Sequence, residues 1–462
     1  MKHDQGQGCV LRSDLVTLAE ASRFWLRLGV VSFGGPAGQI ALLHRELVER
    51  RRWLSERRYL HALNYCMLLP GPEATQLATY LGWLMHGVPG GLIAGGLFLA
   101  PSVVVLTTLA TVYALWGQLP LLMSVFAVLK PTVLAIVIVA AWRLGRRTLH
   151  TSLLVGLAGA AFTALTLLQA PYPLVVIGAG LIGLICGRWR PALLQPGSIS
   201  RADTASASRT APEASRQAHA AIHDDHTPTP PHAQVSRRGL GLTLLIWGAA
   251  LLLPLLALSV LGGWNGTLTQ MARFFTKVAL FSFGGAYAVL PYVAQGAVEQ
   301  FNWLSADQML DGLALGETTP GPLIMVVAFV GFMGGWTNGL GGPSGSWTAA
   351  FAATLVTVWF TFLPSFGFIL VGAPLVEATR GDLRFGAPLT AISAAVVGVI
   401  ASLAVLFAAP VLWPDGAFNP MAALVVLLAL VAQLHWRCSV LPLIGMAAGL
   451  GLFRFVLMQG LG

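Results

Sequence analysis

One stretch of about 50 residues occurs twice in the chain, at a constant spacing of 250 residues. Residues 23–72 and 273–322 share 16 identities without a gap, whereas roughly 3–5 are expected between unrelated segments of average composition. The identities include Ser-Phe-Gly-Gly at 32 and 282, Trp-Leu-Ser at 53 and 303, and Pro-Gly-Pro at 70 and 320. Because glycine frees the backbone and proline removes a hydrogen-bond donor, the duplicated positions predict breaks in helices.

The breaks lie within apolar sequence. Of the 462 residues, 56% are apolar and 10% are charged, against roughly 25% charged residues in soluble domains. Apolar runs of about 20 residues recur, which is long enough to cross a bilayer as helix and too long for barrel strands. We therefore predict an all-α, multi-pass membrane protein. The net charge of +9 indicates orientation by cytoplasmic arginine rather than nucleic-acid binding.

Two homologous repeats and a linker describe the predicted organisation. The repeats are expected at 14–187 and 268–458, with a connecting transmembrane helix at 239–262. Residues 188–238 are rich in Ser, Ala, Thr, Pro, His and Arg, the composition of a disordered cytoplasmic linker. The histidines and aspartates of this linker have no recurring ligand spacing, and the four cysteines form no CxxC pair, so no metal site is predicted.

The distribution of arginine predicts that the two repeats are inverted relative to each other. Loop 44–58 contains six Arg and three Glu, so it is placed in the cytoplasm. The equivalent loop, 295–311, contains three carboxylates and no Lys or Arg, and it is placed outside. The cytoplasmic and outside placements of the loops are consistent with one another if the connecting helix crosses the membrane once and the segments 268–294 and 306–336 re-enter it. Inverted repeats with broken helices near the midplane are a recurring plan of transporters.

The first Pro-Gly-Pro break is predicted to bind an anion. A helix that restarts after Pro70-Gly71-Pro72 points free N–H groups and the positive end of its dipole at the break. Thr75 and Gln76 can donate hydrogen bonds to an oxyanion from the first turn. Glu73 repels an anion unless it is protonated, which makes it a candidate for proton coupling; the alternative is that it only caps the helix. The second break is followed by Leu323-Ile324-Met325, so the anion site is placed mainly on the first copy.

Five cationic side chains lie in or beside apolar sequence, where charge is costly and usually functional. Lys130 lies within an apolar run, and the pair Arg23 and Arg27 recurs as Arg273 and Lys277 before the second break. A cation beside a helix amino terminus suits a divalent oxyanion that has lost its water. The alternative is that these long side chains reach the membrane surface and anchor their helices.

The membrane segments contain no nucleophile–His–acid set, no GxxxxGK[ST] motif and no metal-ligand pair. We therefore expect a transporter rather than an enzyme, and no cofactor. The alternatives from other classes are a membrane-embedded enzyme, and a scaffold or sensor that acts through the linker. Concentrative transport would draw on an ion gradient or on the membrane potential.

Three groups of residues in the first copy carry a family resemblance: Phe33-Gly34-Gly35-Pro36, then Pro70-Gly71-Pro72 with Thr75 and Gln76, then Lys130-Pro131. They resemble the chromate ion transporter family in its long, two-domain form. The second copy resembles that family's second-domain motifs at Phe283-Gly284-Gly285 and Pro320-Gly321-Pro322, although Ala286 stands where the first copy has Pro36.

The resemblance implies secondary active export of chromate across the bacterial inner membrane, driven by the proton motive force as in an antiporter, and hence chromate resistance. The partners it implies are chromate, protons and the lipid bilayer, with no nucleic acid. Sulfate is a tetrahedral dianion of similar size, so a transporter of sulfate or another oxyanion is the alternative. The oligomeric state stays open, a homodimer included.

Overall fold

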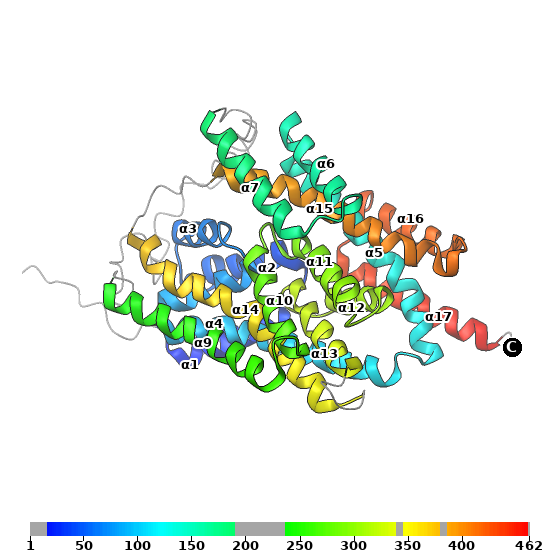
Figure 1. Cartoon of the computed structure of the whole chain (residues 1–462), viewed down its shortest axis with the longest axis horizontal. Helices are drawn as coiled ribbons and strands as arrows, with labels where there is room; N and C mark the ends of the chain where they lie inside the picture. The colour runs from blue at the N-terminus through cyan, green and yellow to red at the C-terminus, as the bar shows by residue number, and fades with distance from the viewer. Residues whose placement is uncertain (1–15, 190–235, 339–344, 379–385, 461–462) are drawn as a thin grey trace, which may run out of the picture.

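The computed structural model describes residues 16–189, 236–338, 345–378 and 386–460 (Figure 1). Most of the predicted linker, 188–238, lies outside these described residues. Within them every regular element is a helix, which confirms the predicted all-α fold. Seven of the described helices are apolar and long enough to cross a membrane, as the recurring apolar runs predict.

The first repeat and the connecting helix occupy the described residues up to 262. Their elements are α1 (Leu18–Val31), α2 (Gly35–His44), the π-helical turn η2 (Arg45–Arg50), α3 (Glu56–Cys66), α4 (Glu73–Trp116), α5 (Pro120–Thr148), α6 (Ser152–Thr166), α7 (Tyr172–Trp189) and the connecting helix α9 (Arg237–Gly262).

The second repeat has the same order of elements, including a π-helical turn at the same offset. Its elements are α10 (Thr267–Phe281), α11 (Ala286–Ala294), η6 (Gln295–Gln300), α12 (Ala306–Thr318), the 3-10 turn η7 (Leu323–Met325), α13 (Val326–Asn338), α14 (Trp347–Ala378), α15 (Gly386–Leu412), the 3-10 turn η9 (Pro414–Gly416), α16 (Pro420–Leu434) and α17 (Val440–Gly460).

Helices are interrupted at each duplicated motif, as predicted. The interruptions lie at 32–34 and 67–72 in the first repeat, and at 282–285 and 319–322 in the second. Each Pro-Gly-Pro motif stands immediately before the next helical element, where the last proline has an extended backbone. The inversion of the repeats and the re-entrance of the broken segments stay predictions.

Helix α4 folds back on itself and corresponds to α13 and α14 together. Its backbone leaves the helical region at His86 and at Gly87, which has φ of 67°. The two arms pack against each other, because a side chain on Gly95 would meet Thr79, although these residues would lie about 24 Å apart in a straight helix. The first arm, 73–85, is about 20 Å long and is too short to cross a bilayer core of about 30 Å.

The two repeats exchange their last helices. In Figure 1, α6 and α7 of the first repeat lie against α15 of the second, while α16 and α17 lie against α5 of the first. Helix α4 also packs on α14 and α13. Each repeat therefore completes its core with helices of the other, so the two form one packed body around the breaks.

Candidate functional site

The four helix breaks meet in pairs, each pair formed by both repeats. The backbone N–H of Gly71 donates to the carbonyl oxygen of Ser282 at 2.9 Å, and the N–H of Gly321 donates to the carbonyl oxygen of Ser32 at 2.6 Å. The two bonds are equivalent: in each, the glycine of one repeat donates to the corresponding serine of the other. Such reciprocal contacts are typical of two copies related by a two-fold axis. Because a broken helix leaves unpaired N–H groups that are costly in lipid, each repeat satisfies a donor that the other exposes.

A glycine is required at both Pro-Gly-Pro breaks. Gly71 has φ of 130° and Gly321 has φ of 101°, a region that other residues rarely adopt. A side chain on Gly71 would collide with the hydroxyl of Ser365, and one on Gly321 would collide with the hydroxyl of Ser102. Each serine comes from the repeat opposite to the glycine that it touches.

These two serines belong to a repeat that the ungapped comparison misses. Pro101-Ser102 and Pro364-Ser365 recur at a spacing of 263 residues rather than 250. The difference of 13 residues accumulates between the arms of the helical hairpin, where the second repeat has a longer connection than the turn at His86-Gly87. Searching the second half for a displaced Pro-Ser pair would have found both residues.

Unpartnered polar atoms surround the first Pro-Gly-Pro break. The Gln76 side-chain nitrogen donates to the carbonyl oxygen of Pro70 at 2.7 Å. Among the described residues, the hydroxyls of Thr75 and Ser365 and the side-chain oxygen of Gln76 are buried and have no hydrogen-bond partner. Buried hydroxyls are normally hydrogen-bonded, so two donors here are free to bind a ligand.

The second Pro-Gly-Pro break is closed by the protein itself. The Ser102 hydroxyl donates a short hydrogen bond to the carbonyl oxygen of Pro320. The following residues, Leu323, Ile324 and Met325, are all buried and apolar. The Pro320 carbonyl of this break is therefore satisfied by another side chain of the described protein.

Glu73 begins α4 and faces the break of the opposite repeat. Its Oε1 lies 3.7 Å from the position that a Cβ atom on Gly285 would occupy, and its Oε2 is buried without a hydrogen-bond partner among the described residues. The carboxylate therefore lies between the Pro70-Gly71-Pro72 break and the break at 282–285 of the other repeat. Gly284 and Gly285 have φ of 80° and 93°, a region that favours glycine. The backbone that faces the Glu73 carboxylate therefore carries no side chain.

A cavity of about 1180 Å³ connects these breaks to the surface. Phe33, Pro36, Glu73, Phe283 and Gly284 of three breaks line it, together with the polar side chains of His44, Arg45, Glu49, Tyr59, Arg147, Thr148 and Ser393. Arg45 and Arg147 are exposed, while Oε2 of Glu73 is buried next to the buried Pro70-Gly71-Pro72 break. Cations at the entrance of a cleft raise the local concentration of anions.

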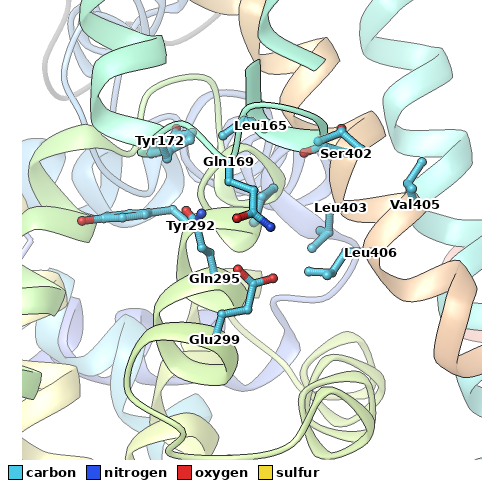
Figure 2. A pocket seen from close by; sticks show the side chains of 12 residues that line it. Leu165, Gln169, Tyr172, Tyr292, Gln295, Glu299, Ser402, Leu403, Val405 and Leu406 are labelled. Carbon is cyan, nitrogen blue, oxygen red and sulfur yellow. The ribbon is translucent and has the colours of Figure 1, made fainter. Parts of the chain in front are cut away.

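A smaller pocket of about 210 Å³ occupies the equivalent position in the second repeat (Figure 2). Pro291, Tyr292, Gln295 and Glu299 line it, at spacings of 250 from Ala41, Leu42, Arg45 and Glu49 of the large cavity. Figure 2 shows Gln169 and Glu299 directed toward each other across it. The rings of Tyr172 and Tyr292 stack at 5.2 Å. The pocket of the second repeat is thus several times smaller than the equivalent cavity of the first.

Lys130 does not lie at the first break. Its Nζ lies 3.3 Å from Oδ1 of Asp307 and 3.6 Å from Oδ1 of Asp311, in a separate cavity of about 400 Å³. In the sequence, both aspartates indicated only on which side of the membrane the loop lies, and they were not predicted as partners of Lys130. Two carboxylates in or beside apolar sequence, one helical turn apart, were the available signal.

The paired cations before the breaks lie on the outside of their helices. Arg23, Arg27 and Lys277 are exposed, and the guanidinium of Arg273 lies 4.2 Å above the ring of Trp264. The structure does not bring these four side chains to the breaks. Their positions favour the anchoring interpretation, because the apolar faces of α1 and α10 are the buried ones.

Comparison with known proteins gives the family. The profile described as chromate transporter matches residues 19–184 and 269–452. The chain is 28% identical over 404 residues to the chromate transport protein of Cupriavidus metallidurans, covering 87% of this chain and 85% of the relative. It is 30% identical over 382 residues to that of Pseudomonas aeruginosa, with 81% and 77% covered. It is 27% identical over 397 residues to a probable chromate transport protein of Synechococcus elongatus, with 84% of each covered.

No solved structure matches the chain. The family and the seven apolar helices make it a multi-pass membrane protein, and a bacterial inner membrane fits its bacterial relatives. The two matched ranges cover most of each repeat and contain all four breaks. The chain belongs to the chromate transporter family, in the long form with two repeats.

Proposed function

We propose that this protein exports chromate across the membrane through the cavity at the helix breaks, driven by the proton motive force. The observation that carries the proposal is the first Pro-Gly-Pro break. There, the amino terminus of α4 lies with two buried hydroxyls, of Thr75 and Ser365, that have no partner among the described residues, and Glu73 of the same first turn lines the large cavity. This combination suits an oxyanion.

The first turn of α4 supplies donors in a fixed geometry. The N–H groups of an initial helical turn have no partner within their helix, and the extended Pro72 precedes them. Gly71 adds no side chain to the space beside them. A tetrahedral dianion held here would accept hydrogen bonds from this turn and from Thr75 and Ser365.

Glu73 links anion binding to protons in this proposal. An ionised carboxylate beside a bound dianion would repel it, so Glu73 holds a proton while the anion is bound. A proton bound together with the anion moves in the same direction as the anion, so Glu73 sets the pH at which the anion binds, and the driving proton, which moves inward while chromate moves outward, must be carried by another group. Under the alternative interpretation, Glu73 only stabilises the start of α4 through the helix dipole.

The difference between the two equivalent cavities supports transport by alternating access. The large cavity carries exposed arginines, which the positive-inside rule places at the cytoplasm. The small pocket belongs to the loop that has no lysine or arginine. Exchanging the shapes of the two repeats would close the first side and open the second, which moves an anion outward.

Everted membrane vesicles test the proposal. Vesicles that contain the protein are expected to accumulate chromate when their lumen is acidified, and a protonophore is expected to abolish this accumulation. Vesicles without the protein serve as the control, and excess sulfate measures selectivity for chromate. Accumulation that a protonophore leaves unchanged would contradict proton coupling, and absence of any chromate uptake would contradict the transport function itself.

A further inference from the structure

A second buried carboxylate lies between the repeats, away from the first break. Asp311 of α12 accepts a hydrogen bond from the hydroxyl of Tyr113 of α4, at 2.8 Å to Oδ2. Its Oδ1 lies 3.6 Å from Nζ of Lys130 of α5 and has no hydrogen-bond partner among the described residues. One repeat therefore supplies the carboxylate, and the other supplies both the cation and the hydroxyl that face it.

Burial and access are combined at Asp311. The residue is 4% exposed, yet it lines the cavity of about 400 Å³ together with Ser305 and Gln308 at the start of α12. Asp307, one turn earlier on the same helix, has a side chain that is 60% exposed. A buried carboxylate beside a cavity that is large enough to hold water is well placed to exchange a proton.

Few other ionisable groups surround Asp311. The neighbouring elements α13, α15 and η7 contain no titratable side chain, and α17 contains only Arg454. Helices α4 and α5 also pack on α12 and supply Tyr113 and Lys130, so that, among the described residues, the charged and titratable groups that act on the carboxylate are Lys130, Tyr113 and Asp307. Burial raises the pKa of the Asp311 carboxyl to about 6, while the charge of Lys130 and the Tyr113 hydrogen bond act in the opposite direction.

We propose that Asp311 is the residue through which the driving proton enters the transport cycle, on the side of the membrane opposite the large cavity. The inference rests on the proposed proton-driven transport and names a residue for it that is distinct from Glu73. The carboxylate accepts a proton from a hydronium ion that reaches its cavity: an O–H bond of the hydronium breaks, an O–H bond forms on Asp311, and a water molecule is released. The loop that contains Asp307 has no lysine or arginine, which places this cavity outside.

Protonation of Asp311 acts on the contact between the repeats. The neutral acid no longer attracts Lys130, so the contact between α12 and α5 is weakened. Helix α12 leads directly to the break at Pro320-Gly321-Pro322, where Gly321 donates to Ser32 of the first repeat. A proton bound at Asp311, about two helical turns before this break, can therefore shift the pairing of the break that follows α12.

Purified protein in liposomes separates coupling from transport. Two rates are measured: chromate uptake into liposomes with an acidic lumen, and exchange of labelled chromate at equal concentration and equal pH on both sides. Exchange needs no net proton movement. We expect Asp311→Asn to lower gradient-driven uptake by about tenfold or more while exchange stays within about twofold of the unaltered protein.

Asp307→Asn is the matched control, since it removes a charge from the same helix and from the same Lys130. Because that carboxylate is mostly in water, the variant is expected to keep gradient-driven uptake within about twofold. Asp311→Asn that retains the full gradient-driven uptake would overturn the proposal, as would a loss of exchange equal to the loss of uptake in correctly folded protein.

A conservative variant decides the matter if Asp311→Asn does not fold. Asp311→Glu keeps a titratable group but moves it by one methylene, so gradient-driven uptake should persist with a displaced pH midpoint. An unchanged pH midpoint would overturn the role of Asp311. Failure of the unaltered protein to exchange chromate would instead defeat the proposed function, so the two failures are distinguishable.

Discussion

At Pro70-Gly71-Pro72 and at Pro320-Gly321-Pro322 the backbone follows the same course. Both glycines have positive φ, both N–H groups donate to a serine carbonyl of the opposite repeat, and both sites are packed by a serine hydroxyl of the opposite repeat. The side chains around them differ. The first break has unpartnered Thr75 and Ser365 hydroxyls, whereas the second has a satisfied Ser102 and buried aliphatic residues.

The two breaks show that the duplicated backbone is kept in both copies, whereas the side chains around it differ. The backbone hydrogen bond between the repeats must be kept in both copies, because loss of the acceptor leaves a buried N–H group without a partner. Side chains that face the break can diverge once one copy binds the anion. The second break then serves as a structural partner, while the chemistry concentrates at the first.

Replacing either glycine of the two breaks by alanine is expected to have the largest effect. Each variant forces a side chain into a positive-φ position and against a serine hydroxyl. Strain and overpacking together are expected to cost about 2–5 kcal/mol at each site. Gly71→Ala and Gly321→Ala should therefore lower the Tm of the solubilised protein to a similar extent and abolish chromate transport.

Gly241→Ala provides the control for these two variants. Gly241 lies in α9, and nothing stands within 4 Å of the position that its Cβ atom would take. Alanine there is expected to leave transport unchanged and to stabilise the helix by up to about 1 kcal/mol. A large loss of Tm for Gly71→Ala with none for Gly321→Ala would break the proposed equivalence of the two backbones.

Removing one hydroxyl from each break is expected to give opposite results. Thr75→Val keeps the shape of the side chain and removes a donor that has no protein partner. Apparent chromate affinity should fall by about tenfold, or about 1.4 kcal/mol, with no loss of Tm. Ser102→Ala leaves the Pro320 carbonyl without its donor, so stability should fall by about 1–3 kcal/mol with affinity nearly unchanged.

Binding titrations and thermal unfolding on the same samples measure both quantities. The comparison fails if Thr75→Val lowers Tm as much as Ser102→Ala does, because the Thr75 hydroxyl would then have a structural partner. It also fails if Ser102→Ala weakens chromate binding as strongly as Thr75→Val, since the second break would then share the anion site.

The sequence predicted the positions of the breaks but not how they pair. Glycine and proline interrupt helices locally, so the breaks at 32–34 and 67–72 follow from residue types alone. The hydrogen bond between Gly71 and Ser282 joins residues 211 positions apart. Rules that use only neighbouring residues cannot predict it. The polarity of the first break was also predictable, since Thr75 and Gln76 follow Pro72 directly.

The partners supplied by distant helices could not be predicted in the same way. Ser365 reaches the first break from α14, and Asp311 reaches Lys130 from α12, through packing that depends on the whole arrangement of helices. The placement of Lys130 beside the anion was a reasonable expectation for a lone charge in apolar sequence. The structure instead pairs that charge with two aspartates in the first half of α12.

The smallest expected effect concerns Glu73, which has Leu323 as its counterpart in the second copy. Glu73→Gln removes the charge and keeps the size, so chromate binding should no longer weaken as the pH rises. Above neutral pH the variant is expected to bind about three- to tenfold more tightly than the unaltered protein, since one repulsion at a few ångströms is removed. Glu317→Gln is the control, because that carboxylate accepts a hydrogen bond from Tyr287 at 2.5 Å and does not line the large cavity. Binding that Glu73→Gln abolishes, rather than tightens, would show that the carboxylate holds the start of α4 and does not regulate the anion.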